Sequence, residues 1–195
     1  VDVAPRSKKK NGNEGYNFPG GKRSFWSLAN QNASGSAAAG KLNVSAHDGE
    51  VTCVQTHCAN RCVVTTGVDG VIRVWKFNEM KIDIEIDVGS PIVCGSLHED
   101  SLFAVGCADK HVRVYDIETG KRVRTFAPRV GSGEVKRVEM SSDARWTLVL
   151  DDRGSIRVYD IPAARLVQDL ILGADKVVDM SFSPKREMLV TVHEN

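Results

Sequence analysis

A ten-residue segment occurs three times in the chain, and it restricts the possible folds more than any other feature. The copies begin at Val68 (VDGVIRVWKF), Ala108 (ADKHVRVYDI) and Asp152 (DRGSIRVYDI). Their aromatic residues fall at positions 75, 115 and 159, so successive copies are 40 and 44 residues apart. A period of about 40 to 45 residues is typical of arrays of four-stranded sheets. The sequence therefore predicts an all-β repeat protein.

Each copy of the segment has the pattern of a turn followed by a strand. In the first copy, the Asp-Gly pair at 69–70 suits the positive backbone dihedrals of a tight hairpin turn. Ile72 and Val74 then alternate with Arg73, which places apolar and polar side chains on opposite faces of a strand. A second alternating run at 82–88 predicts an outer strand with one face in water.

The repeats resemble those of the WD-repeat family, which fold into β-propellers. A blade of this family typically holds a His before its first strand, an Asp in the tight turn and a Trp in the third strand, joined by hydrogen bonds. His47, Asp69 and Trp75 match these positions in the first repeat. A strand hydroxyl normally completes the set, and either Thr65 or Thr66 could provide it.

The later repeats depart from this pattern. The second repeat keeps Asp109 but has Tyr115 in place of Trp and no matching His. The third repeat has Arg153 at the Asp position. We therefore expect the full structural hydrogen-bond network of His47, Asp69 and Trp75 in the first repeat alone.

The repeats divide the chain into three parts. Residues 46–195 are predicted to form three whole four-stranded blades and an incomplete last blade. Residues 16–45 are predicted to be the end of a preceding blade with a low-complexity insertion rich in Ala, Ser, Asn and Gly. Residues 1–15 carry few large apolar side chains and are predicted to be a mobile basic loop. The expected fold is a β-propeller fragment within a longer protein.

A narrower resemblance covers about residues 16–195. Trp75-Lys76-Phe77, the stretch 97–101 (LHEDS) and the stretch 180–184 (MSFSP) are similar to a family of WD-repeat subunits of the nucleolar small-subunit processome. The resemblance implies a non-catalytic scaffold that acts in small-subunit ribosomal RNA processing and ribosome biogenesis, in the nucleus and nucleolus. It also implies other WD-repeat processome subunits as partners, with pre-ribosomal RNA and the U3 small nucleolar ribonucleoprotein as further candidates.

Basic side chains near the N-terminus could contact RNA. The candidates are Lys8, Lys9, Lys10, Lys22 and Arg23. Phe25 and Trp26 follow them, and a mixture of cations and aromatic rings can bind single-stranded RNA through phosphate contacts and base stacking. The alternative is an ordinary strand in which Trp26 is buried.

Composition and motifs favour neither an enzyme nor a metal protein. The 195 residues carry a formal net charge of +1, which gives no general preference for nucleic acid or membranes. No apolar run reaches the ~20 residues of a membrane span. The sequence lacks G-x-S-x-G, P-loop, G-x-G-x-x-G and H-E-x-x-H motifs, so we expect no catalysis, cofactor or small-molecule substrate. Cys53, Cys58 and Cys62 with His57 lack a second ligand pair, so we expect no zinc.

Four further histidines are expected to have ordinary structural roles. His57, His98, His111 and His193 are expected to be solvated or to cap turns.

A second function class is a WD-repeat substrate receptor of a cullin-type ubiquitin ligase, or another protein-interaction scaffold. Such receptors usually have an Arg two residues after a Trp-Asp pair. Asn78, Glu118 and Pro162 occupy that place here, which disfavours the receptor.

Overall fold

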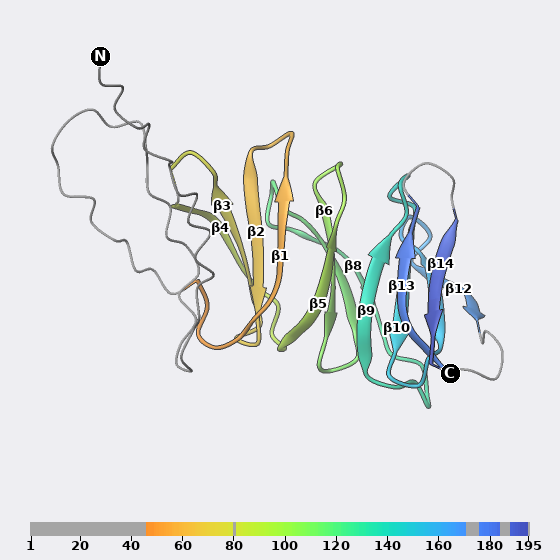
Figure 1. The fold of residues 1–195 in the computed structure, drawn as a ribbon. Helices are drawn as coiled ribbons and strands as arrows, with labels where there is room; N and C mark the ends of the chain where they lie inside the picture. The colour runs from red at the N-terminus through yellow and green to blue at the C-terminus, as the bar shows by residue number, and fades with distance from the viewer. Residues whose placement is uncertain (1–45, 80, 171–175, 184–187, 195) are drawn as a thin grey trace, which may run out of the picture.

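A computed structural model of the chain describes residues 46–79, 81–170, 176–183 and 188–194. These residues form fourteen β-strands, and the described residues contain no helix. The strands are arranged in separate sheets that stand side by side in an open arc (Figure 1). None of the described residues belongs to a helix long and apolar enough to cross a membrane.

Three of the sheets have four antiparallel strands in chain order. The first consists of β1 (Val51–His57), β2 (Cys62–Gly67), β3 (Val71–Lys76) and β4 (Lys81–Asp87). The second consists of β5 (Ile92–Leu97), β6 (Leu102–Cys107), β7 (Val112–Asp116) and β8 (Arg122–Phe126). The third consists of β9 (Val135–Met140), β10 (Trp146–Asp151), β11 (Ile156–Asp160) and β12 (Arg165–Leu170). A fourth sheet has two described strands, β13 (Val177–Phe182) and β14 (Leu189–His193).

The sheets confirm the predicted all-β propeller fragment. The repeated segment forms β3, β7 and β11, the third strand of each complete blade. The predicted parts at residues 1–15 and 16–45 lie outside the described residues, as does the insertion within the second part. The blade pattern at 46–194 therefore follows from the repeat period and the alternation of apolar residues.

The apolar core lies between the blades. Val64 and Ile72 of the first blade belong to the same buried cluster as Phe103 and Val105 of the second. A second cluster joins blades two and three, and a third joins blade three to β13 and β14. Each blade therefore buries its apolar faces mainly by stacking on its neighbours.

The packing between blades two and three is tight at Gly106. A Cβ atom at this position would stand 2.5 Å from Cγ1 of Val135 and 2.8 Å from Sγ of Cys94. Cys53 and Cys94 both follow a β-bulge at the start of their strand, which confirms that they occupy equivalent positions in successive blades. The absence of a side chain at residue 106 thus allows β6 to approach β9 closely.

The outer strand of the first blade is less buried than its sequence pattern predicts. Ile86 is buried, but Ile82 is 42% exposed. Ile82 lies one residue into β4, beside the turn that also exposes Phe77. Burial along this strand therefore increases toward the end that packs on the second blade.

Candidate functional site

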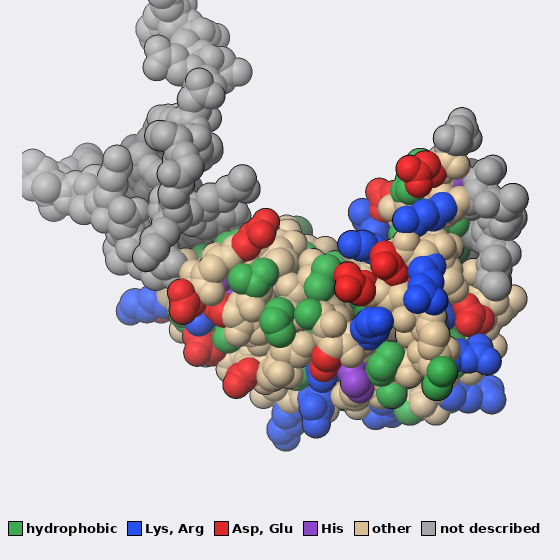
Figure 2. All heavy atoms as spheres, turned by 90° about the horizontal axis from the view of Figure 1, so that it is seen from below, with side chains coloured by type: hydrophobic (Ala, Val, Ile, Leu, Met, Phe, Trp, Pro, Cys, Tyr) green, Lys and Arg blue, Asp and Glu red, His purple; other side chains and the backbone are tan. Residues whose placement is uncertain are grey.

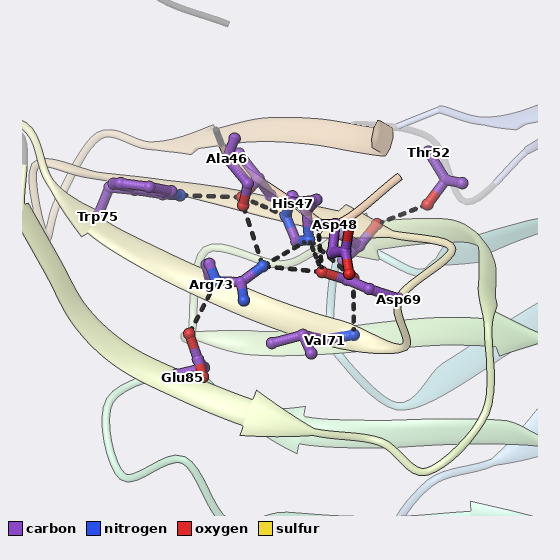
Figure 3. Close-up of polar contacts among 11 residues, drawn as sticks. Ala46, His47, Asp48, Thr52, Asp69, Val71, Arg73, Trp75 and Glu85 are labelled. Carbon is purple, nitrogen blue, oxygen red and sulfur yellow. Dashed lines mark hydrogen bonds and ion pairs between the residues drawn. The ribbon is translucent and has the colours of Figure 1, made fainter. Parts of the chain in front are cut away.

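A chain of hydrogen bonds links two strands and a loop of the first blade. The indole Nε1 of Trp75 in β3 donates to the hydroxyl oxygen of Thr65 in β2 over 2.9 Å. That hydroxyl lies 2.8 Å from Nε2 of His47, which precedes β1. All three side chains are buried. Figure 3 shows His47 and Trp75 directed toward the same place between the strands.

The carboxylate of Asp69 closes this chain at the turn between β2 and β3. Nδ1 of His47 lies 2.9 Å from Oδ1 of Asp69. Because a carboxylate only accepts, we assign the imidazole proton to Nδ1, so that Nε2 accepts the hydroxyl proton of Thr65. The main-chain amides of Asp48 and Val71 also donate to Asp69, at 3.1 and 3.2 Å (Figure 3). One carboxylate thus fixes both the turn and the loop before β1.

Arg73 extends the network toward the outer strand. Its Nη1 donates to Oδ2 of Asp69 and to the carbonyl oxygen of Ala46, each over 3.0 Å. Its Nε donates to Glu85 of β4 over 2.8 Å. Nη1 also lies 2.9 Å from Nδ1 of His47. With the proton on Nδ1, both nitrogens are donors, and they share Asp69 as their acceptor. The network therefore reaches from the loop before β1 to β4.

The environment of Asp69 keeps its carboxyl ionised. Burial raises the pKa of this carboxyl, because it penalises the charged form. The hydrogen bonds from His47, Arg73 and two main-chain amides outweigh that effect and lower the pKa to about 2. Asp69 is therefore a fixed negative charge at neutral pH.

The structure identifies the hydroxyl that the sequence left open. Thr65 contacts both His47 and Trp75, whereas Thr66 lies on the other face of β2 and contacts the hydroxyl of Thr52 at 3.0 Å. Successive residues of a strand point to opposite faces, so only one of the two threonines can meet the His and Trp.

The later blades keep an Asp–Arg pair without the full set. In the second blade, Arg113 donates two hydrogen bonds to Asp109, of 3.0 and 2.6 Å. In the third blade, the carboxylate comes from Asp151, two residues before the position that Arg153 fills. Asp151 accepts from the amides of Gly133, Arg153 and Ser155, each at 3.1 Å. Its partner Arg157 lies 3.3 Å away.

Sequence reasoning missed this recurring arginine. Arg73, Arg113 and Arg157 each stand two residues before the aromatic residue of the repeated segment. Each pairs with the turn carboxylate of its own blade. Their identical place in the three copies was a signal that could have revealed the pair.

Two histidines expected to be solvated or to cap turns also join neighbouring blades. His57 is 4% exposed, and its Nε2 lies 2.8 Å from the carbonyl oxygen of Glu99 in the second blade. His98 repeats the arrangement, with Nε2 3.0 Å from the carbonyl oxygen of Ser142 in the third. In both, Nδ1 accepts a nearby main-chain amide, so the expected turn capping is present as well. Solvation was the wrong expectation for His57, because the next blade covers the end of β1.

The other candidate residues either lie outside the described residues or are at separate places in the fold. Lys8, Lys9, Lys10, Lys22 and Arg23 lie outside the described residues. His111 lies near Asp109 at a turn, and His193 contacts Thr191.

Four of the five cysteines lie in strands and are buried or partly buried. Burial raises the pKa of the Cys53 and Cys94 thiols, to about 11 and 12. Cys58, in contrast, is exposed. In the described part of the chain, no group of three or more His, Cys, Asp or Glu side chains could hold a metal ion.

Comparison with known proteins places these blades in one family. The family model for the WDR36/Utp21 second beta-propeller domain matches residues 29–195. The chain is 32% identical over 144 residues to the U3 small nucleolar RNA-associated protein 21 homolog of Schizosaccharomyces pombe, which covers 73% of this chain and 16% of that protein.

Two further relatives match a similar stretch. WD repeat-containing protein 36 of Homo sapiens is 31% identical over 149 residues, or 76% of this chain and 16% of the human protein. U3 small nucleolar RNA-associated protein 21 of Saccharomyces cerevisiae is 26% identical over 148 residues, or 75% of this chain and 15% of the yeast protein. The matched part of the chain thus spans about one-sixth of the length of these relatives. The blades, the His–Thr–Trp–Asp network and the family match together show that this chain belongs to the WDR36/Utp21 family of WD-repeat proteins.

Proposed function

We propose that the protein containing these blades is a non-catalytic scaffold of the nucleolar small-subunit processome, acting in small-subunit ribosomal RNA processing. The observation that carries the proposal is the family match over residues 29–195, together with relatives whose names associate them with U3 small nucleolar RNA. On this proposal the protein works in the nucleus and nucleolus.

The geometry supports a scaffold because its polar networks hold backbone in place. Asp69 and Asp151 each bind main-chain amides of a turn and of a neighbouring loop. His57 and His98 fix one blade to the next. Such bonds keep the loops at the rim in a constant arrangement, which suits a surface that binds other proteins.

The proposed partners are other WD-repeat processome subunits, the U3 small nucleolar ribonucleoprotein and pre-ribosomal RNA. Direct RNA contact by Lys8, Lys9, Lys10, Lys22 and Arg23 is part of this proposal. Phosphate contacts supply most non-specific affinity and weaken steeply with salt. Replacing the three consecutive lysines should therefore reduce RNA crosslinking and leave the protein assembly intact.

Two separate experiments test the function: depletion of the protein, and affinity purification of a tagged copy. We expect unprocessed ribosomal RNA precursor to accumulate and the large-subunit RNA to be spared. A tagged protein should recover U3 ribonucleoprotein components. Recovery of cullin adaptors without U3 components, with stabilisation of a substrate protein on depletion, would replace this proposal with the ubiquitin-ligase receptor.

A further inference from the structure

Two adjoining hollows lie at the ends of the sheets where β9 and β13 begin. The larger, of about 440 Å³, is lined by Lys136, Arg137 and Lys176 among others. The smaller, of about 330 Å³, is lined by Arg129, Arg153 and Arg157 among others. Asp151 contributes to both, so they adjoin. Figure 2 shows Lys and Arg side chains gathered on this side of the face, over the third and fourth blades. We call these six cationic residues the basic rim.

The carboxylates in the hollows are already engaged. Asp151 accepts three main-chain amides and pairs with Arg157. Asp169 pairs with Arg129, and Asp179 pairs with Arg137. The fourth, Asp152, accepts the amide of Glu134 at 2.8 Å. Six cationic side chains therefore face four carboxylates that have partners within the protein.

Part of the cationic charge has no partner among the residues that the structure describes. Lys136 and Lys176 are exposed, and no hydrogen bond or ion pair joins their ammonium groups to another residue in the described ranges. Arg157 is 2% exposed, and its Nε has no hydrogen-bond partner among the described residues. That nitrogen is too buried to touch a ligand, but its charge adds positive potential beneath the smaller hollow.

We propose that the basic rim binds the phosphodiester backbone of single-stranded RNA. Guanidinium and ammonium groups are the usual partners of phosphate oxygens, and adjoining hollows that together present five accessible cations suit a ligand whose charges repeat along a chain. None of the described residues that line the hollows is aromatic, so these residues offer the bases no stacking platform. The rim binds the backbone without reading the sequence. The choice of RNA over another polyanion rests on the proposed function.

The test compares two double variants of the full chain that lose the same charge. Lys136→Gln with Lys176→Gln removes the two cations of the rim that have no partner among the described residues, and it breaks no hydrogen bond or ion pair between those residues. Lys81→Gln with Lys121→Gln is the matched control, because both lysines are exposed and lie at the opposite ends of the sheets. Lys81 begins β4, and Lys121 immediately precedes β8. Each pair is also made together with Lys8→Gln, Lys9→Gln and Lys10→Gln, which removes the contribution of the N-terminal segment.

Binding is measured by fluorescence anisotropy with a labelled single-stranded RNA of mixed sequence over a series of salt concentrations. The rim variant should bind about tenfold more weakly at low salt, and the slope of log affinity against log salt should fall by about 1.4 for two lost phosphate contacts. The control variant should keep the affinity and slope of the parent. Uridine and adenosine homopolymers should bind alike.

Two results would overturn the proposal. In one, the rim and control variants lose the same affinity and slope. In the other, polyglutamate displaces the RNA from the parent protein, and the rim variant loses as much affinity for polyglutamate as for RNA. That result would make the rim an acidic-peptide site. Failure of the proposed function would be distinguishable, because a protein absent from U3 particles could still bind RNA through the rim in this assay.

Discussion

Nε2 of His57 lies 2.8 Å from the carbonyl oxygen of Glu99, so a buried imidazole joins the first blade to the second. His57→Ala should remove this bond and leave the carbonyl without its partner, at a cost of about 1 to 3 kcal/mol in the free energy of unfolding. Chemical denaturation of the parent and variant measures the difference. His111→Ala, at a partly exposed turn, should cost less than about 0.5 kcal/mol. Equal losses in the two variants would show that the link between blades contributes nothing.

We propose that His47 and Asp69 act as one unit with Trp75 in stabilising the first blade. His47→Ala and Asp69→Ala should each lower the free energy of unfolding by about 1 to 3 kcal/mol, because buried partners lose their hydrogen bonds. If the bonds are cooperative, the double variant should cost less than the sum of the single losses. A double-mutant cycle measured by denaturation decides this, and strictly additive losses would contradict the shared network.

The lowered pKa of Asp69 predicts how stability depends on pH. The pKa falls from 3.8 to about 2 on folding, so the folded state favours the charged carboxylate. Its contribution is fully present above about pH 4 and is lost as the pH falls toward 2, and it amounts to about 2 kcal/mol. Comparing unfolding of the parent and Asp69→Asn between pH 7 and pH 2 tests this. The difference in stability between the two should shrink across that lower window, and a constant difference would contradict the assignment.

Asp151 should matter more to stability than Asp109. Arg157 is 2% exposed, so Asp151→Ala would leave a buried charge without its carboxylate and cost about 3 to 5 kcal/mol. The Asp109 side chain is 35% exposed, so water can partly replace it beside Arg113 and Asp109→Ala should cost less. Adding Arg157→Leu to Asp151→Ala should recover part of the loss, as thermal unfolding would show. Two amides of the turn and one of the loop before β9 would still lack their acceptor.

Most of the fold could be predicted from the sequence because the repeat is local. The Asp-Gly turn and the alternation around Arg73 specify one hairpin, and the period then places the same hairpin in the next blades. The turn carboxylate of the third blade could not be found in this way. Aligning the repeats places Arg153 opposite Asp69. In the folded turn it is Asp151 that contacts the amide of Ser155 and the side chain of Arg157, which correspond to Val71 and Arg73 of the first blade.

Contacts between blades were the other part that the sequence did not predict. His57 is covered only when the second blade stacks on the first. The basic rim likewise depends on bringing Arg129, Arg153 and Lys176 to one face from separate loops. The repeat period predicts the strands and turns within each blade. It contains little information on the contacts between two successive blades.

The placement of the core between the blades has a consequence for how relatives diverge. Gly106 faces Val135 so closely that a methyl group at residue 106 would require a smaller side chain at 135. These positions belong to different repeats, so a change of volume in one blade is compensated in the next one along the chain. Alignments of relatives should therefore show covariation between core positions of neighbouring repeats. The residues that vary together should lie on the two facing sides of successive blades.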